Sequence, residues 1–303
     1  MGARAVSDEE TLLPAHFRSD GWRDFPSPAK LNLFLQITGR RADGYHTLQT
    51  VFQLLDWGDT VWLRPRLDGQ VLRLGKATYA PLAEHDLLVR AAKSLQKESN
   101  CSQGADIRIE KRIPVGGGFG GGSSNAATVL RALNVLWGAG VPTERLETLG
   151  LALGADVPVF VRGQTAWAEC VGEALQPVTL GPRAYLVADS GVSVPTAELF
   201  QASDLIRDAA PATLADFLSG MLHGNAFEPV LRQRAPLAST LLDRLGAWGQ
   251  ARLTGTGGGC FVSMPSLAEA KAAQQQLSGD GWACWACSGV DRSPLLASLE
   301  NPR

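Results

Sequence analysis

The 303-residue sequence lacks a strong excess of charge of either sign. It has 28 Lys and Arg residues against 30 Asp and Glu residues, for a formal net charge of −2. Proteins that bind nucleic acid or an anionic membrane through their surface potential carry a basic excess, so we expect neither partner. No apolar run reaches the roughly 20 residues that a membrane-spanning helix needs. A length of 303 residues suits one large domain or two small ones, and a hydrophobic content of 45% is that of an ordinary globular protein.

The patterns of a secreted protein are also missing. Residues 1–21 have neither the basic nor the apolar region of a secretory signal, and we interpret them as a loosely ordered extension. The five cysteines are an odd number, and only Cys284 and Cys287 have C-x-x-C spacing. Such a pair can be a redox centre or half a zinc site, but no second pair accompanies it. We therefore interpret both as small buried hydrophobes, in keeping with a reducing cytoplasm.

One stretch stands out for its glycine content. Residues 116–122 are glycine except for Phe119. A short strand is predicted just before, over 105–109, and apolar residues recur at helical spacing over 126–137. Gly138 stands where a helix C-cap glycine is expected.

A glycine run that leads straight into a helix is a phosphate site in physical terms. Without Cβ atoms the backbone can approach a polyanion closely. The free amides of the first helical turn and the helix dipole then attract the negative charge. The alternative is a flexible linker, but a linker does not lie between a strand and an amphipathic helix.

Two common phosphate loops do not fit this stretch. The sequence has no G-x-x-x-x-G-K-[ST] loop. Gly116, Gly118 and Gly121 satisfy the dinucleotide pattern G-x-G-x-x-G, although a run so rich in glycine can hardly avoid it. The dinucleotide fold also needs a second strand that ends in an acidic residue about 20 residues further on. Here residues 138–144 read as a turn into another helix, which disfavours that fold.

Three motifs, in order along the chain, resemble those of the GHMP small-molecule kinases. They are PSPAKLNL at 26–33, PVGGGFGGGSSNAA at 114–127 and LTGTGGG at 253–259. The wording ADGYH at 42–46 and GADVPVF at 154–160 is similar to the branch of that family that acts on 4-diphosphocytidyl-2-C-methyl-D-erythritol. The resemblance covers residues 26 to about 296.

The resemblance implies an α/β (α+β) two-domain GHMP kinase fold with the active site in the cleft between the domains. We expect an N-terminal domain over 22–165, with the glycine-rich loop, and a C-terminal domain over 166–303. The residue pattern predicts strands over 25–35, 48–55, 167–170, 184–189, 252–253, 260–264 and 282–288, and helices over 84–92, 143–153, 197–207, 212–222, 226–247 and 267–278.

The resemblance makes Lys30 and Asp156 the catalytic residues and places Asn32 in the substrate site. Lys30 and Asn32 share one face of a predicted strand. From the sequence alone, Lys30 could lie on the solvated face of an edge strand. Asp156 could be a helix N-cap, since a proline follows two residues later, and an N-cap position does not exclude a catalytic role.

The implied cofactors are ATP and Mg²⁺. Without a Walker lysine, backbone dipoles and Mg²⁺ must neutralise more of the phosphate charge, and the Ser124 hydroxyl is a candidate Mg²⁺ ligand. Asp86 stands where relatives commonly carry an Asn that contacts adenine, and a carboxylate cannot donate to a ring nitrogen. The candidate ATP-binding residues are Pro114, Gly116, Gly117, Gly118, Gly120, Gly121, Gly122, Ser123, Ser124, Asn125 and Asp86.

The resemblance also implies the residues that hold the acceptor substrate. Tyr45 and Phe200 would stack on the two faces of the cytosine ring, His46 would hydrogen-bond the edge of the ring, and Thr196 would lie near the acceptor hydroxyl. Without the resemblance, Tyr45 and His46 could form the shoulder of a hairpin and Phe200 could be a core aromatic.

The expected activity is ATP-dependent phosphorylation of the substrate's 2-hydroxyl, giving the 2-phosphate and ADP, in non-mevalonate isoprenoid precursor synthesis. We expect a cytoplasmic monomer or homodimer that binds small molecules and neither nucleic acid nor membrane. The alternatives are a kinase of the same fold acting on homoserine, mevalonate or galactose, a non-catalytic nucleotide-binding relative, and a dinucleotide oxidoreductase.

Overall fold

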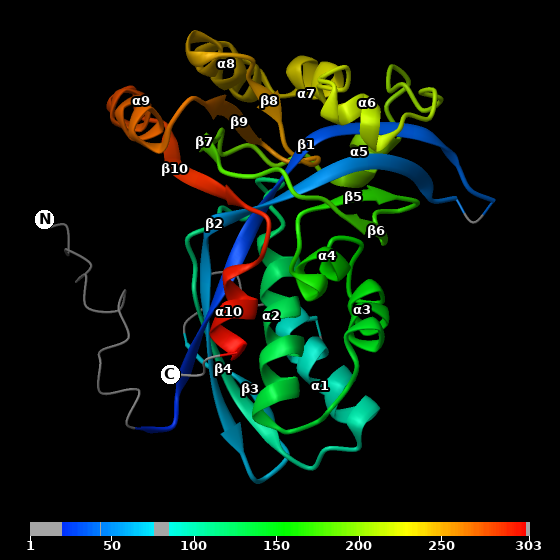
Figure 1. Cartoon of the computed structure of the whole chain (residues 1–303), viewed down its shortest axis with the longest axis vertical. Coiled ribbons are helices and arrows are strands. Elements are labelled where there is room, and N and C mark those ends of the chain that lie inside the picture. The colour runs from blue at the N-terminus through cyan, green and yellow to red at the C-terminus, as the bar shows by residue number, and fades with distance from the viewer. Residues whose placement is uncertain (1–19, 43, 76–84, 301–303) are drawn as a thin grey trace, which may run out of the picture.

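The computed structural model describes residues 20–42, 44–75 and 85–300, and Figure 1 shows its elements. The strands are β1 Arg23–Arg40, β2 His46–Arg66, β3 Val71–Arg73, β4 Gly104–Glu110, β5 Ala166–Glu169, β6 Ala174–Pro177, β7 Arg183–Asp189, β8 Arg252–Leu253, β9 Gly259–Met264 and β10 Ala283–Val290. The helices are α1 Leu87–Ser99, α2 Gly121–Leu136, α3 Thr143–Leu151, α4 Val157–Arg162, α5 Thr196–Phe200, α6 Leu214–Leu218, α7 Glu228–Arg234, α8 Pro236–Leu245, α9 Leu267–Gly279, α10 Pro294–Glu300 and the 3₁₀ turn η2 Gly246–Trp248.

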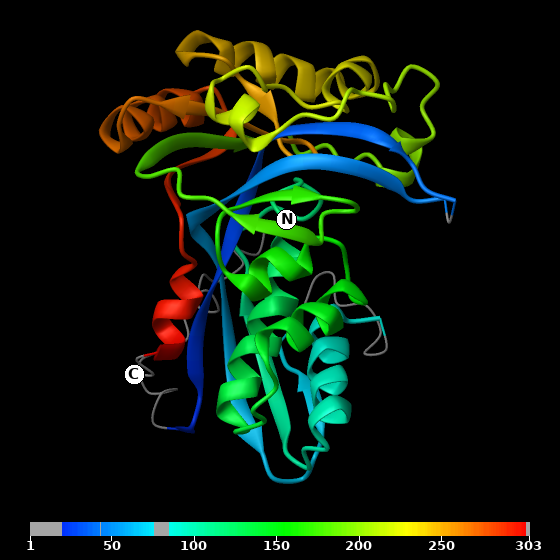
Figure 2. The same cartoon turned by 45° about the vertical axis from the view of Figure 1, so that its right-hand side comes forward.

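Two long antiparallel strands, β1 and β2, run through the whole molecule (Figures 1 and 2). They have 18 and 21 residues. Their register shifts between Pro28 and Lys30. Next to this irregularity the strands come so close that a Cβ on Gly58 would lie 2.2 Å from the carbonyl oxygen of Ser27, so only glycine fits there.

The lower half of the molecule in Figure 1 packs α1 to α4 against the sheet β3-β4-β2 with β1. The predicted helix after the glycine run is α2, whose apolar residues lie in this core. Gly138 follows its last turn with φ of +61°. The amides of Gly138 and Ala139 donate to the carbonyls of Val135 and Asn134, the pattern of a Schellman C-cap.

In the upper half, β10, β7, β9 and β8 continue the sheet and α7, α8 and α9 cover one of its faces. Cys284 packs with the core under these helices, whereas Cys287 packs on the opposite side of the sheet with Tyr185 and Phe261. Two thiols on opposite faces of one strand cannot form a redox pair or share a metal. The interpretation of both cysteines as buried hydrophobes is confirmed.

Several predicted elements need correction. The single helix predicted over 226–247 is two helices, because Pro236 lacks an amide hydrogen and Ala235 before it has non-helical φ and ψ of −130° and 80°. The helices predicted over 197–207 and 212–222 are one turn each, α5 and α6. The strand predicted over 48–55 continues to Arg66, and β3, β6 and α10 had no predicted counterpart.

The cores of the two halves both contain residues from the beginning and the end of the chain's order of elements: β1 contributes to the upper core and α10 to the lower one. Leu35 and Ile37 of β1 belong to the upper core, while Leu295 of α10 packs in the lower one. The predicted boundary between residues 165 and 166 stays a prediction, and most of the predicted extension over 1–21 lies outside the described residues. Among the helices of the described ranges, none is long and apolar enough to cross a bilayer.

Candidate active site

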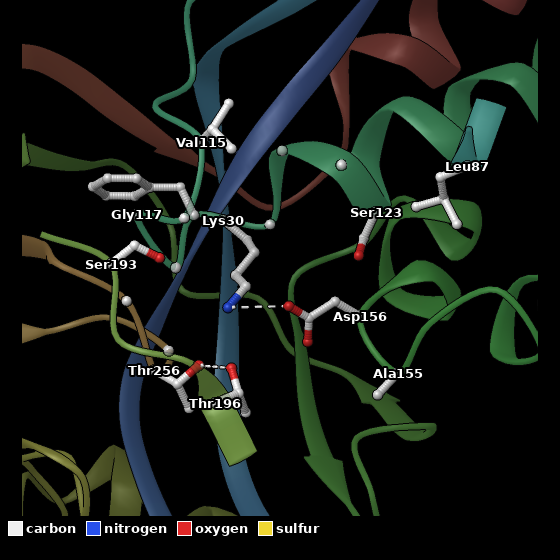
Figure 3. A pocket seen from close by; sticks show the side chains of 18 of the residues that line it. Lys30, Leu87, Val115, Gly117, Ser123, Ala155, Asp156, Ser193, Thr196 and Thr256 are labelled. Atoms are coloured by element: carbon white, nitrogen blue, oxygen red, sulfur yellow. Dashed lines mark hydrogen bonds and ion pairs between the residues drawn. The ribbon is translucent and has the colours of Figure 1, made fainter. Parts of the chain in front are cut away.

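A cavity of about 2060 Å³ opens where the two halves meet. Its walls come from β1, the glycine run, the first turns of α1 and α5, the residues just before α4, and the loop before β9. Figure 3 shows its centre, where side chains from these separate elements point into one space.

The glycine run forms a tight loop over the N-terminus of α2. Gly116, Gly118 and Gly120 have φ of +80°, +80° and +76°, a region that other residues rarely adopt. Helix α2 begins at Gly121, with Gly120 at its N-cap position. Gly121, Gly122 and Ser123 of this first turn line the cavity, and the first amides of a helix have no partner within the helix.

The third motif packs directly against this loop. The amide of Gly259 donates to the carbonyl of Gly117 at 2.9 Å. A Cβ on Gly118 would lie 2.2 Å from the carbonyl oxygen of Thr254, and one on Gly257 would lie 2.2 Å from that of Gly116. The two glycine segments therefore lock together backbone to backbone.

The structure brings Lys30 and Asp156 together across the cavity, 3.4 Å apart (Figure 3). Lys30 is 2% exposed, so it does not lie on a solvated strand face. Its Nζ donates to Asn32 Oδ1 at 2.6 Å and lies 5.3 Å from the centre of the Phe52 ring. Asn32 is fixed in turn, because its Nδ2 donates to Thr50 Oγ1. These contacts hold the Lys30 ammonium in one position, beside Asp156.

Asp156 is at the N-cap position of α4 but does not use its side chain as a cap. Pro158 follows in the first turn of α4 and has no amide hydrogen that needs capping. The carboxylate is 35% exposed on the cavity side and points to Lys30. The backbone of Asp156 therefore starts a helix while its carboxylate is left available in the cavity, and its catalytic role stays a prediction.

The prediction that Ser124 ligates Mg²⁺ does not fit the structure. Its hydroxyl is fully buried and lies 2.9 Å from Ser27 Oγ. Ser123, one residue earlier, lines the cavity, and Figure 3 shows its hydroxyl on the side of Asp156. The side chain of Asn125 is also turned away, donating to Ser27 and Asp59, so any contact of Asn125 with ATP has to come from its backbone.

Asp86 lines the cavity, but internal partners engage both of its oxygens. Oδ1 accepts the amides of Leu88 and Val89 at the start of α1. Oδ2 lies 3.6 Å from Nε of Arg73, a partly buried side chain that also lines the cavity. Arg73 was not predicted as a site residue, because nothing in the local sequence distinguishes it from a surface arginine.

The predicted substrate residues lie at the other end of the cavity, in an arrangement that the sequence did not predict. The rings of His46 and Phe200 are stacked directly, with centroids 4.6 Å apart and planes at 16°. A base between two rings needs about 7 Å, so no base can lie on the face of Phe200 that His46 covers while His46 holds this position. The predicted stack of Tyr45 and Phe200 on the two faces of the cytosine stays a prediction. Tyr45 is 66% exposed at the same end. Thr196 lines the cavity and shares a 2.8 Å hydrogen bond with Thr256.

Burial and charge act together on His46. Desolvation, then the nearby charges of Arg40 and Arg207, hold the pKa of the imidazole below its ordinary value of 6.5. Arg207 also donates to the carbonyl of Phe200 at 2.7 Å and so fixes the end of α5. Neither arginine was singled out from the sequence.

Two further residues of the cavity wall were missed. Lys111 lines the cavity next to Gly121, where its Nζ would be 3.1 Å from an added Cβ. Ser193 likewise lies close to Gly116, since its Oγ would be 2.7 Å from a Cβ added to Gly116. Lys111 is three residues before Pro114, and that closeness to the motif was the available signal.

Comparisons with known proteins agree with this geometry. Residues 86–164 match the family described as GHMP kinases N terminal domain. The chain is 58% identical over 275 residues to a 4-diphosphocytidyl-2-C-methyl-D-erythritol kinase of Xanthomonas axonopodis pv. citri, covering 91% of this chain and 93% of the relative. It is 58% identical over 293 residues to the protein of the same name from Xanthomonas euvesicatoria pv. vesicatoria, covering 97% and 98%.

A solved structure leads to the same family. The crystal structure of a 4-(cytidine 5'-diphospho)-2C-methyl-D-erythritol kinase superposes with a TM-score of 0.77 at 32% identity, over 88% of this chain and 99% of that one. The α/β fold is that of this solved structure, and the match to the GHMP kinase family includes the glycine loop. The chain belongs to the 4-diphosphocytidyl-2-C-methyl-D-erythritol kinase family of the GHMP kinases.

Proposed function

We propose that this chain transfers the γ-phosphoryl group of ATP to the 2-hydroxyl of 4-diphosphocytidyl-2-C-methyl-D-erythritol, giving the 2-phosphate and ADP. The observation that carries the proposal is the Lys30–Asp156 pair, 3.4 Å apart and facing the glycine loop in one cavity. A carboxylate, an ammonium and a phosphate loop in that arrangement are the parts that phosphoryl transfer to an alcohol needs.

The glycine loop would hold the phosphates of ATP through the backbone amides at the start of α2. Kinase sites bind Mg²⁺ through one or two carboxylates together with the phosphates of the substrate. The described residues fit that mode: they contain no cluster of three or more metal-ligating side chains, but Asp156 and Ser123 line the cavity beside the loop. When bound, Mg²⁺ would neutralise charge on the phosphates.

Asp156 would accept the proton of the acceptor hydroxyl as the bond to phosphorus forms. Lys30 would orient this carboxylate and meet negative charge on the transferred group, with Asn32 holding Lys30 in place. The transition state of phosphoryl transfer is loose. Correct placement of these groups therefore matters more than strong basicity.

Tyr45, His46 and Phe200 would bind the cytosine, and Thr196 would lie near the acceptor. Stacking tolerates any base, so hydrogen bonds from His46 and its neighbours have to distinguish cytosine from uracil. His46 covers one face of the Phe200 ring. A base can therefore stack on Phe200 only if His46 moves aside or if the base enters from the side of Tyr45.

We place the enzyme in the cytoplasm, as a monomer or homodimer with small-molecule partners only. The five free cysteines suit a reducing compartment.

Release of ADP tests this function directly. The purified protein would be given ATP, Mg²⁺ and 4-diphosphocytidyl-2-C-methyl-D-erythritol, its uridine analogue, or homoserine. We expect turnover with the cytidine compound and little with the other two. Turnover with homoserine alone would keep the kinase fold and overturn the assigned roles of Tyr45, His46 and Phe200.

A further inference from the structure

One carboxylate, Asp59 on β2, connects both arms of the glycine loop. Asp59 is 2% exposed, and its two oxygens accept four hydrogen bonds. Oδ1 accepts the amides of Arg112 and Ile113, at 2.7 and 2.8 Å, from the segment that leads into the loop. Oδ2 accepts Lys111 Nζ at 2.5 Å and Asn125 Nδ2 at 2.9 Å, the latter from the helix that follows the loop.

The residue opposite Asp59 on β1 reinforces this connection. Ser27 pairs with Asp59 in the β1–β2 register. Its hydroxyl accepts Asn125 Nδ2 at 2.8 Å and lies 2.9 Å from Ser124 Oγ. Gly58 beside Asp59 lets the two strands approach at this point. The start of α2 is therefore bonded to β1 and β2 together.

The same stretch of β1 carries the reactive ammonium. Three residues after Ser27, the amide of Lys30 donates to the carbonyl of Phe119 in the middle of the glycine loop, at 3.0 Å. The Phe119 ring is 1% exposed and meets Trp57 edge-on, with centroids 5.7 Å apart. Movement of the loop relative to Asp59 would therefore also change its position relative to Lys30.

We propose that Asp59 is a positioning residue for phosphate transfer: it fixes the backbone amides of the glycine loop in register with Lys30. The proposal rests on the proposed function in one respect, that the loop holds the phosphates of a nucleotide. Asp59 does not line the cavity itself, so it acts through the loop rather than on the nucleotide.

The geometry requires a carboxylate at this position. A buried carboxylate is costly unless hydrogen bonds satisfy it, and here two backbone amides, an ammonium and a side-chain amide do so. An asparagine could accept from only one of the two pairs, because its NH₂ group would face donors at the other. Asp59→Asn therefore loosens the loop without changing side-chain volume.

The chain offers a matched control in Asp106. It is 1% exposed, and its oxygens accept hydrogen bonds from Arg64 and Arg66. It lies on β4 in the same half of the molecule and is absent from the cavity wall. Asp106→Asn should reduce thermal stability as Asp59→Asn does, but leave nucleotide binding within twofold of wild type.

The experiment measures the Kd of Mg-ADP by calorimetry, together with the KM for ATP and for the acceptor, on variants whose folding is checked by circular dichroism. For Asp59→Asn we expect Mg-ADP binding to weaken about tenfold or more, the scale of one lost charge-assisted hydrogen bond. The KM for ATP should rise in parallel and the KM for the acceptor should stay within twofold. Ser27→Ala, a milder change, should weaken Mg-ADP binding about threefold and serves if Asp59→Asn does not fold.

The folded variants could instead bind Mg-ADP with wild-type affinity and show only a fall in thermal midpoint like that of Asp106→Asn. Asp59 would then be a structural residue only, and the proposal would be overturned. A wild-type protein that does not bind Mg-ADP would also overturn it. Because Mg-ADP binding needs no acceptor, absence of turnover with the cytidine compound would instead overturn the proposed function and leave this inference standing.

Discussion

The two ends of the cavity are built in different ways. At the end with the glycine loop, Lys30 is buried and hydrogen-bonded, and two glycine segments interlock backbone to backbone. At the other end, Tyr45 is 66% exposed and Phe200 sits on a one-turn helix. Chemistry needs groups held in place in advance, whereas binding of a base tolerates side chains that adjust. The contrast indicates that changes at the first end should affect turnover and changes at the second should affect substrate affinity.

The strongest test of this contrast is Asp156→Asn. Asparagine has nearly the same shape but cannot take a proton from the acceptor. We expect kcat to fall by about 10²- to 10⁴-fold, while the Kd of ADP measured without Mg²⁺ stays within twofold. Rapid-quench and steady-state assays would measure the first quantity and calorimetry the second. A variant with near-normal turnover would remove Asp156 from the role of base.

Gly118→Ala should disrupt the glycine loop, because the added Cβ would clash with the backbone of the third motif. The added Cβ would lie 2.2 Å from the carbonyl oxygen of Thr254, at a φ of +80°. Gly140→Ala is the matched control, since Gly140 has φ of +65° and nothing within 4 Å of an added Cβ. The control should lose only the roughly 1–2 kcal/mol of a left-handed alanine. Denaturant unfolding should show a larger loss for Gly118→Ala, and only this variant should lose Mg-ADP binding.

Changes at the aromatic end should act on the acceptor alone. Stacking on a base contributes about 1–3 kcal/mol, so Tyr45→Ala and Phe200→Ala should each raise the KM for the cytidine substrate about 5- to 150-fold. The KM for ATP should not change. Phe200→Ala should also cost some stability, because its ring packs against Phe227. Unchanged substrate affinity in both variants would show that the base binds elsewhere.

The smallest expected effect concerns pH. Burial, then Arg40 and Arg207, lower the pKa of His46 from 6.5 in the folded chain. The unfolded chain therefore binds more protons as the pH falls below about 6.5, and the folded state loses stability over that range. The thermal midpoint of the wild type should fall further between pH 7.5 and 5.5 than that of His46→Gln, whose side chain stays neutral. Equal shifts in the two proteins would contradict the lowered pKa.

The sequence could predict what short stretches of chain determine. The glycine loop, helix α2 with its C-terminal Gly138, and the start of α4 at Asp156 all depend on residues close together in the chain. The choice between Ser123 and Ser124 could not be made this way. Adjacent helical side chains point about 100° apart, so the side that each faces depends on how the whole helix is docked.

Contacts between segments far apart in the chain could not be predicted from the sequence. Asp59 and its partner Asn125 are 66 residues apart, and no local pattern marks either as half of a pair. The stack of His46 on Phe200 likewise joins the start of β2 to α5. Pro236 is the opposite case: its effect on the helix predicted over 226–247 is purely local and could have been foreseen from its missing amide.

The length of β2 has a consequence for how the chain folds as it is synthesised. Gln53 in the middle of β2 bonds to the carbonyl of Val290, 237 residues later. Translation at about 5–20 residues per second leaves on the order of 10 to 50 s between the emergence of the two. During that interval one edge of the apolar upper part of β2 lacks its final neighbour, an arrangement prone to wrong pairing with other chains. The strand that unites the two halves of the folded enzyme is thus also a segment that needs protection before the chain is complete.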